Sequence, residues 1–138
     1  MLVLISIQKK IYRYNNFDYN NKNQVVGAGG IGAPALLYLA GSGVGKLGIV
    51  DFDSVEESNL HRQVIHNEHR INMNKARSAR IAIAQFNSSV EVKIYEQKFE
   101  NHNAYEILQD YDLIIDASDN PKTRYLVNDA AITMKVVD

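Results

Sequence analysis

The sequence predicts an α/β protein with a Rossmann-like, mostly parallel sheet and helices on both faces. Short runs rich in β-branched residues alternate with segments whose apolar residues recur at helical spacing, which is typical of βαβ units. A glycine-rich turn directly follows the first of these runs. At 138 residues the chain has the usual length of one domain, so we expect a single folded domain.

The predicted domain covers residues 24–138, and residues 1–23 differ from it in composition. The Asn- and Tyr-rich stretch 12–23 lacks apolar residues at regular spacing, which predicts a poorly ordered or loosely docked arm. Residues 1–7 are apolar but far shorter than the roughly 20 residues that span a bilayer. No basic segment precedes them, so we expect no signal peptide, no membrane partner and a cytoplasmic protein.

Five strands are predicted from short apolar runs that are rich in β-branched residues. They lie at residues 24–26, 47–51, 90–95, 113–116 and 135–137.

Two crossover helices are predicted between the first three strands, because apolar residues three or four positions apart share one helical face. In residues 31–40 and 75–86 these faces are Ile31, Ala35, Leu36, Leu39 and Ala76, Ala79, Ile83, Phe86. A third helix is expected over 104–109, with Asn103 as its N-cap and Glu106 three residues later. A fourth begins at Pro121, a residue favoured at the first helical position.

Charge and cysteine content exclude several classes of function. The formal net charge is −1, from 15 basic and 16 acidic residues, which argues against a nucleic-acid surface built on bulk positive charge. The chain has no cysteine, so it has no disulfide, thiolate zinc site or cysteine nucleophile of its own.

Residues 27–32 match G-x-G-x-x-G at the predicted junction of a strand and a helix. Exposed N–H groups and the helix dipole favour a phosphate at such a junction. Asp51 ends the next strand, 19 residues after Gly32, where a carboxylate accepts hydrogen bonds from ribose hydroxyls. The pattern favours a nucleotide site over a purely structural glycine turn, but it does not separate ATP from NAD.

The run VDFDSVEESNLHRQ, residues 50–63, resembles the D-x-D-x-V-x-x-S-N-L-x-R-Q signature of the E1-like ThiF/MoeB-type adenylating enzymes. The resemblance continues with Lys75, with DASDN at 116–120 and with TRYLVND at 123–129, and it covers Gln24 to the C-terminus. Within that family the chain is most similar to the eukaryotic adenylyltransferase-sulfurtransferase type, on the segment SNLHRQVIH, residues 58–66.

The resemblance implies an ATP-dependent reaction at the C-terminal glycine carboxylate of a ubiquitin-like sulfur-carrier protein that ends in Gly-Gly. An acyl-adenylate forms, pyrophosphate leaves, and the product serves molybdopterin synthesis or tRNA thiolation. It also implies Mg²⁺ and a homodimer. The nucleotide contacts that it implies are Gly30, Asp51, Ser58, Asn59, Leu60, His61, Arg62, Lys75, Asp119 and Asn120, with Arg62, Lys75 and Asp119 catalytic and Asp119 near Mg²⁺.

The residues themselves allow plainer interpretations. Asp119 and Asn120 precede Pro121, as helix caps do. Lys75 could be a solvated lysine in a first helical turn, although the helix dipole disfavours a cation there. Arg62 by itself could be a surface arginine. The four histidines, His61, His66, His69 and His102, show no metal-ligand spacing and are interpreted as surface or capping residues.

Three functional alternatives stay open at this point. Family members usually continue with further strands, a Cys-x-x-Cys zinc site and a reactive cysteine, so the domain is interpreted as C-terminally incomplete, without zinc. An inactive scaffold subunit or pseudoenzyme is therefore one alternative. An NAD(P)-binding oxidoreductase domain is a second, which rests on the glycine turn and Asp51 alone. A relative that dehydrates a modified tRNA base is a third.

Overall fold

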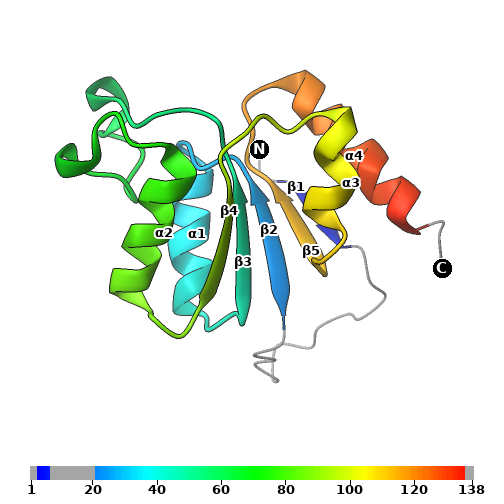
Figure 1. Ribbon diagram of the computed structural model, residues 1–138, viewed down its shortest axis with the longest axis horizontal. Helices are drawn as coiled ribbons and strands as arrows, with labels where there is room; N and C mark the ends of the chain where they lie inside the picture. The colour runs from blue at the N-terminus through cyan, green and yellow to red at the C-terminus, as the bar shows by residue number, and fades with distance from the viewer. Residues whose placement is uncertain (1–2, 7–20, 136–138) are drawn as a thin grey trace.

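The computed structural model describes residues 3–6 and 21–135, and it has one five-stranded sheet (Figure 1). The strand order is β1-β5-β2-β3-β4. The strands β2, β3, β4 and β5 run parallel to one another, and β1 pairs antiparallel with β5. The strand bounds are β1 Val3–Ser6, β2 Lys22–Val26, β3 Lys46–Val50, β4 Glu91–Tyr95 and β5 Leu113–Asp116.

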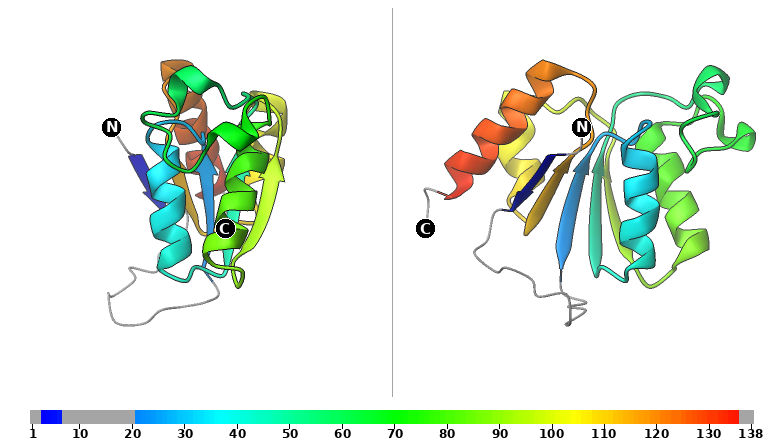
Figure 2. Two further views of the ribbon diagram at one scale, coloured as in Figure 1. Left: turned by 90° about the vertical axis from the view of Figure 1, so that its left-hand side faces the viewer. Right: turned by 180° about the vertical axis from the view of Figure 1, so that it is seen from behind.

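Four helices cover the two faces of this sheet. They are α1 Gly32–Gly41, α2 Lys75–Phe86, α3 Asn101–Leu108 and α4 Pro121–Lys135. Helices α1 and α2 lie on one face and α3 and α4 on the other, as the views in Figures 1 and 2 show. The predicted Rossmann-like class, a mostly parallel sheet between two helical layers, is confirmed.

Each face of the sheet has its own apolar core. Side chains alternate along a strand, so Val25 and Ile49 pack toward α1 and α2, while Val26 and Val50 pack toward α3 and α4. All four are at most 3% exposed. Burial on both faces explains why the strands read as continuous apolar runs rather than alternating ones.

The chain changes direction across the sheet between β2 and β5. From β2 it winds through α1 to β3 and through α2 to β4, and α3 then returns it to β5 on the other side of β2. At such a switch point the connections leave the carboxyl ends of two neighbouring strands in opposite directions, and a crevice opens between them. The connection from β3 to α2 contains two short 3₁₀ turns, η1 Glu57–Asn59 and η2 Glu68–Arg70.

The sheet begins earlier in the chain than predicted. Strand β2 begins at Lys22 rather than Gln24, since β3 and β5 provide backbone partners on both sides of it. Val3–Ser6, which was predicted to lie in the arm, forms β1 beside β5. Its β-prone residues pair with the otherwise open edge of β5. The remainder of the predicted arm, residues 7–20, lies outside the described residues.

Two other local predictions were wrong. Lys135, predicted to open a strand, ends α4, because Val127, Ala131 and Met134 keep helical spacing against the core; residues 136–138 lie outside the described part. Helix α3 begins earlier, with Glu100 as its N-cap, and the Asn103 side chain accepts a bond from the Glu100 N–H.

The predicted inner faces of the first two helices also need correction at their ends. Phe86 is 61% exposed, since α2 ends there and its ring lies beside Gly41 rather than over the sheet. Ile31 is 38% exposed, and α1 buries the predicted Leu36 together with Ala33 and Ala40. Among the described residues, no helix combines the length and the apolar character that crossing a membrane requires.

Candidate functional site

A pocket opens at the switch point, beyond the carboxyl ends of β2, β3 and β5. Its lining comes from the glycine turn, the β3–α2 connection, the β4–α3 loop and the β5–α4 loop. Seven of the residues predicted for the site line it: Gly30, Asp51, Asn59, Arg62, Lys75, Asp119 and Asn120. The other three, Ser58, Leu60 and His61, are not among its lining residues.

The glycine turn joins β2 to α1 at one wall of this pocket. Gly27 has a φ of 98°, which a side chain would strain. A Cβ at Gly32 would collide with the Gly27 carbonyl oxygen, so the turn needs glycine at both places. Helix α1 has no side-chain cap at Ile31 and no acidic residue in its first turn. Its first N–H groups therefore favour an anion in the pocket.

Asp51 holds the turn from the end of β3. Its Oδ2 accepts a hydrogen bond from the Ala28 N–H at 2.7 Å, and its Oδ1 accepts one from the Asp53 N–H at 2.8 Å. Burial raises the pKa of the Asp51 carboxyl, and these two bonds and nearby Lys75 oppose the shift. Each carboxylate oxygen has a second lone pair, so this bracing does not prevent Asp51 from accepting a ligand hydroxyl.

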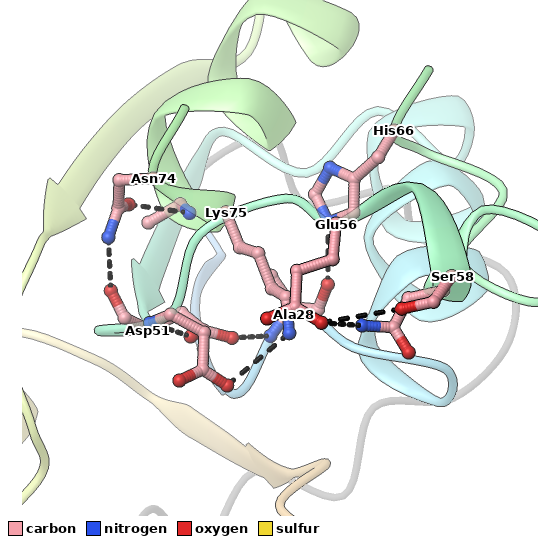
Figure 3. Close-up of polar contacts among 10 residues, drawn as sticks. Ala28, Asp51, Glu56, Ser58, His66, Asn74 and Lys75 are labelled. Carbon is pink, nitrogen blue, oxygen red and sulfur yellow. Dashed lines mark hydrogen bonds and ion pairs between the residues drawn. The ribbon is translucent and has the colours of Figure 1, made fainter. Parts of the chain in front are cut away.

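Lys75 is buried at the start of α2, with only 9% of its side chain exposed. Its Nζ lies 3.3 Å from Asp53 Oδ2, and its own N–H bonds the Asp53 carbonyl at 2.8 Å. Asn74 caps the helix: its Oδ1 accepts from Ala76 and Arg77, and its Nδ2 donates to the Asp51 carbonyl (Figure 3). The plain interpretation of Lys75 as a solvated lysine is therefore wrong. Asn74 fixes the start of α2, and Lys75, the first helical residue, lines the pocket.

Arg62 and Asn59 come from the β3–α2 connection. The stem of Arg62 lies over Gly30, with Cδ 3.6 Å from the position that a Cβ there would take. The guanidinium forms no ion pair within the described part of the chain. The Asn59 Nδ2 and the Ser58 hydroxyl both donate to Glu56 Oε2, at 3.3 and 3.4 Å. This pair of bonds orders η1 at the mouth of the pocket.

Gln63 is a site residue that sequence reasoning did not select. It lines the pocket beside Gly29 yet is only 4% exposed, and its buried Oε1 has no partner among the described residues. A buried, unsatisfied acceptor costs free energy unless a ligand or water pairs with it. Its position next to Arg62 in the matched run was the available signal.

His66 was predicted to lie at the surface or in a cap, and this prediction was wrong. The residue is 6% exposed, because the β3–α2 connection folds back over the glycine turn. Its Nε2 lies 2.8 Å from the Ala28 carbonyl oxygen and its Nδ1 lies 2.8 Å from the Ser78 hydroxyl. Burial lowers the pKa of His66, and nearby Lys75 and Arg70 add to the effect. The other three histidines are exposed, as predicted.

The β5–α4 loop supplies Asp119 and Asn120, which are both exposed in the pocket. Asn120 Oδ1 accepts a bond from the Lys122 N–H at 2.9 Å, as an N-cap does, so the capping interpretation holds for Asn120. Arg124 donates to the Ser118 carbonyl at 3.2 Å, and its buried Nε has no partner in the described residues. The structured residues contain no cluster of three side chains that could by themselves hold a metal.

A glycine turn, a strand-end carboxylate and two cationic side chains at the switch point of a doubly wound sheet define a Rossmann-like domain of the nucleotide-binding class. The model of the ThiF family matches residues 19–137. The chain belongs to the ThiF family.

Three curated relatives illustrate this membership. The chain is 47% identical over 116 residues to the adenylyltransferase and sulfurtransferase MOCS3 of Drosophila persimilis, covering 84% of the chain and 26% of the relative. It is 50% identical over 115 residues to the adenylyltransferase and sulfurtransferase UBA4 of Vanderwaltozyma polyspora, covering 83% and 26%. It is 53% identical over 113 residues to the probable adenylyltransferase/sulfurtransferase MoeZ of Mycobacterium tuberculosis, covering 82% and 29%. The chain thus spans between a quarter and a third of each.

Solved structures share the fold. The tRNA N6-threonylcarbamoyladenosine dehydratase TcdA of E. coli, in complex with ATP, superposes with a TM-score of 0.75 at 25% identity, covering 79% of the chain and 45% of that structure. E. coli MccB with ATP superposes with a TM-score of 0.62 at 29% identity, covering 64% and 27%. Both similar structures are described as ATP complexes.

Proposed function

We propose that this chain is the nucleotide-binding part of an adenylyltransferase that activates the C-terminal glycine carboxylate of a ubiquitin-like sulfur-carrier protein. The observation that carries the proposal is the convergence of Arg62, the buried Lys75 and the uncapped start of α1 on one pocket, with Asp51 at its floor. The names of the relatives, adenylyltransferase and sulfurtransferase, support the same reaction.

The reaction joins two anions, which explains the need for these groups. A carboxylate oxygen of the carrier attacks the α-phosphorus of ATP, a P–O bond forms, and the bond to the β-phosphate oxygen breaks to release pyrophosphate. Arg62 and Lys75 are assigned to the phosphates, and the N–H groups of the glycine turn provide fixed donors. Removing one well-placed donor of this kind typically lowers the rate by about 10² to 10³.

The remaining assignments are those that the resemblance to ThiF/MoeB-type enzymes implies, and each of these residues lines the pocket. Asp51 is assigned to the ribose, Gly30 to close backbone approach, and Asn59 to phosphate. Asp119 is assigned to Mg²⁺, which binds to one or two carboxylates together with substrate phosphates rather than to a closed cluster of protein ligands. Asp119 is exposed and lines the pocket, so its carboxylate is open to an ion that the phosphates bring with them. The roles of Ser58, Leu60 and His61 stay predictions, as do the homodimer and the cytoplasmic location.

Calorimetric titration with Mg-ATP and with NAD separates the adenylyltransferase from an oxidoreductase domain. Tighter binding of ATP is expected, since a triphosphate matches the cations. Arg62→Ala and Lys75→Met should each weaken ATP binding at least tenfold, the order of one charged hydrogen bond. Tighter binding of NAD, or ATP binding that Asp51→Ala leaves unchanged, would contradict the assignment.

Exchange of labelled pyrophosphate into ATP, with a carrier ending in Gly-Gly, separates an enzyme from a scaffold subunit. Weak exchange is expected, because much of the rate in such reactions comes from positioning the two substrates, and the chain spans only part of its relatives. A chain that binds ATP but shows no exchange above the level of Arg62→Ala would favour the scaffold alternative.

A further inference from the structure

His66 lies on the side of the glycine turn opposite Asp51, and both residues form a hydrogen bond with the backbone of Ala28. The Ala28 N–H donates to Asp51 Oδ2 at 2.7 Å, and the Ala28 carbonyl accepts from His66 Nε2 at 2.8 Å. Figure 3 shows both contacts converging on Ala28. Because a carbonyl oxygen only accepts, the His66 proton must be on Nε2, and Nδ1 must accept from the Ser78 hydroxyl.

Two further polar groups of the turn are bonded to the protein. The Gly27 N–H donates to the Val50 carbonyl at 2.9 Å, and the Gly29 carbonyl accepts from the Ala33 N–H at 2.9 Å. The Gly29 N–H has no acceptor among the described residues, and Gly29 lines the pocket. In a trans peptide the carbonyl of Ala28 and the N–H of Gly29 point in opposite directions, and the structured chain has no cis bond.

We propose that His66 is a positioning residue for the phosphate site: by holding the Ala28 carbonyl on one side, it directs the Gly29 N–H toward the phosphates of the nucleotide on the other. This inference rests on the proposed function. Without the Nε2–H donor, the Ala28–Gly29 peptide can rotate, and the Gly29 N–H is lost as a fixed donor. Asp51 alone does not prevent the rotation, because it holds the preceding peptide through the Ala28 N–H.

Two substitutions separate this role from simple packing. The amide nitrogen introduced by His66→Gln reaches the place of Nε2 and can donate to the Ala28 carbonyl. The shorter side chain of His66→Asn occupies the place of Nδ1, and it keeps a contact with Ser78 but not with Ala28. His69→Asn is the control, since His69 is an exposed histidine of the same connection.

Binding of ATP and of adenosine is measured by calorimetry for the wild type and these variants. We expect His66→Asn to weaken ATP binding about tenfold, the order of one lost hydrogen bond, and to leave adenosine binding unchanged. His66→Gln and His69→Asn should bind ATP within about twofold of the wild type, since each keeps the donor to Ala28. Equal losses in the two His66 variants, an equal loss for adenosine, or no loss in His66→Asn would overturn the proposal.

Two further measurements keep the result decisive. If His66→Asn does not fold, His66→Leu replaces it, because leucine fills much of the same space but cannot donate to the Ala28 carbonyl. ATP binding about tenfold weaker with unchanged adenosine binding is expected, and unchanged ATP binding overturns the proposal. If the wild type binds no ATP, the proposed function is wrong, and the role of His66 needs a measurement that does not depend on ATP. The orientation of the Gly29 N–H, from its residual dipolar coupling, then decides for His66: a coupling that is the same in wild type and His66→Asn overturns its role.

Discussion

Replacing Asp51 with alanine tests whether this carboxylate holds the glycine turn in addition to meeting the ribose. The substitution removes the acceptor of the Ala28 N–H, and Ala28 is completely buried, so that donor is left unsatisfied at a cost of about 1–3 kcal/mol. The Asp53 N–H also loses its acceptor, but Asp53 is exposed and water replaces the bond. Removing a carboxylate whose pKa burial has raised returns part of the cost.

The expected net loss is about 2 kcal/mol in the free energy of unfolding, equivalent to about a 30-fold change in the unfolding constant. Urea unfolding followed by circular dichroism measures it, and Asp119→Ala serves as the control, since its exposed side chain has no hydrogen bond or ion pair among the described residues. An Asp51→Ala protein as stable as the control, with the same dependence on urea, would refute the bracing role. It would leave Asp51 as a ligand contact only.

Three further predictions concern the same pocket. Gly32→Ala should lower the free energy of unfolding by about 2 kcal/mol or more, because its Cβ meets the Gly27 carbonyl. Gly30→Ala should have a free energy of unfolding within about 1 kcal/mol of the wild type but bind ATP more weakly. Urea unfolding measures the stability of both variants, and calorimetry measures their ATP binding. Because burial lowers the pKa of His66, the unfolded chain binds a proton below pH 6.5 that the folded chain does not, so stability should fall from pH 6.5 downward, more in the wild type than in His66→Gln. Lys75→Met should weaken ATP binding with little change in the thermal midpoint, since its Asp53 partner is half exposed.

The sheet and its crossovers were predictable because they depend on local patterns. Residues 47–50 and 113–115 are largely buried apolar runs, and the glycine spacing at 27–32 marks the turn between β2 and α1. Local rules failed where two candidates for one role lie close together. Both Glu100 and Asn103 can cap α3, and the structure uses Glu100 as the N-cap with Asn103 folding back onto it.

Sequence reasoning selected seven residues that line one pocket, but it did not reveal the network of contacts among them. Matching the run 50–63 selected Asn59 and Arg62 without showing what holds them. The contact of His66 with Ala28 joins residues 38 positions apart, so no periodicity or cap pattern reveals it. The same holds for the burial of Gln63, whose neighbour in space is Gly29. Such contacts depend on how the β3–α2 connection folds back over the turn.

The β3–α2 connection carries both Arg62, at the pocket, and His66, which contacts the glycine turn, so nucleotide binding and the stability of this region should be coupled. Arg70 bonds the Ile65 and Ser78 carbonyls at 3.1 and 2.8 Å, so it fixes the connection to α2 just where His66 reaches the glycine turn. Arg62 lies four residues before His66 in the same connection. The contact of His66 with Ala28 already joins the connection to the glycine turn on one side. A phosphate held between Arg62 and the turn would join the same two segments on the side of the pocket. ATP should stabilise the connection and the turn as one unit, and slower hydrogen exchange at both segments together, rather than at the turn alone, is the expected sign of that coupling.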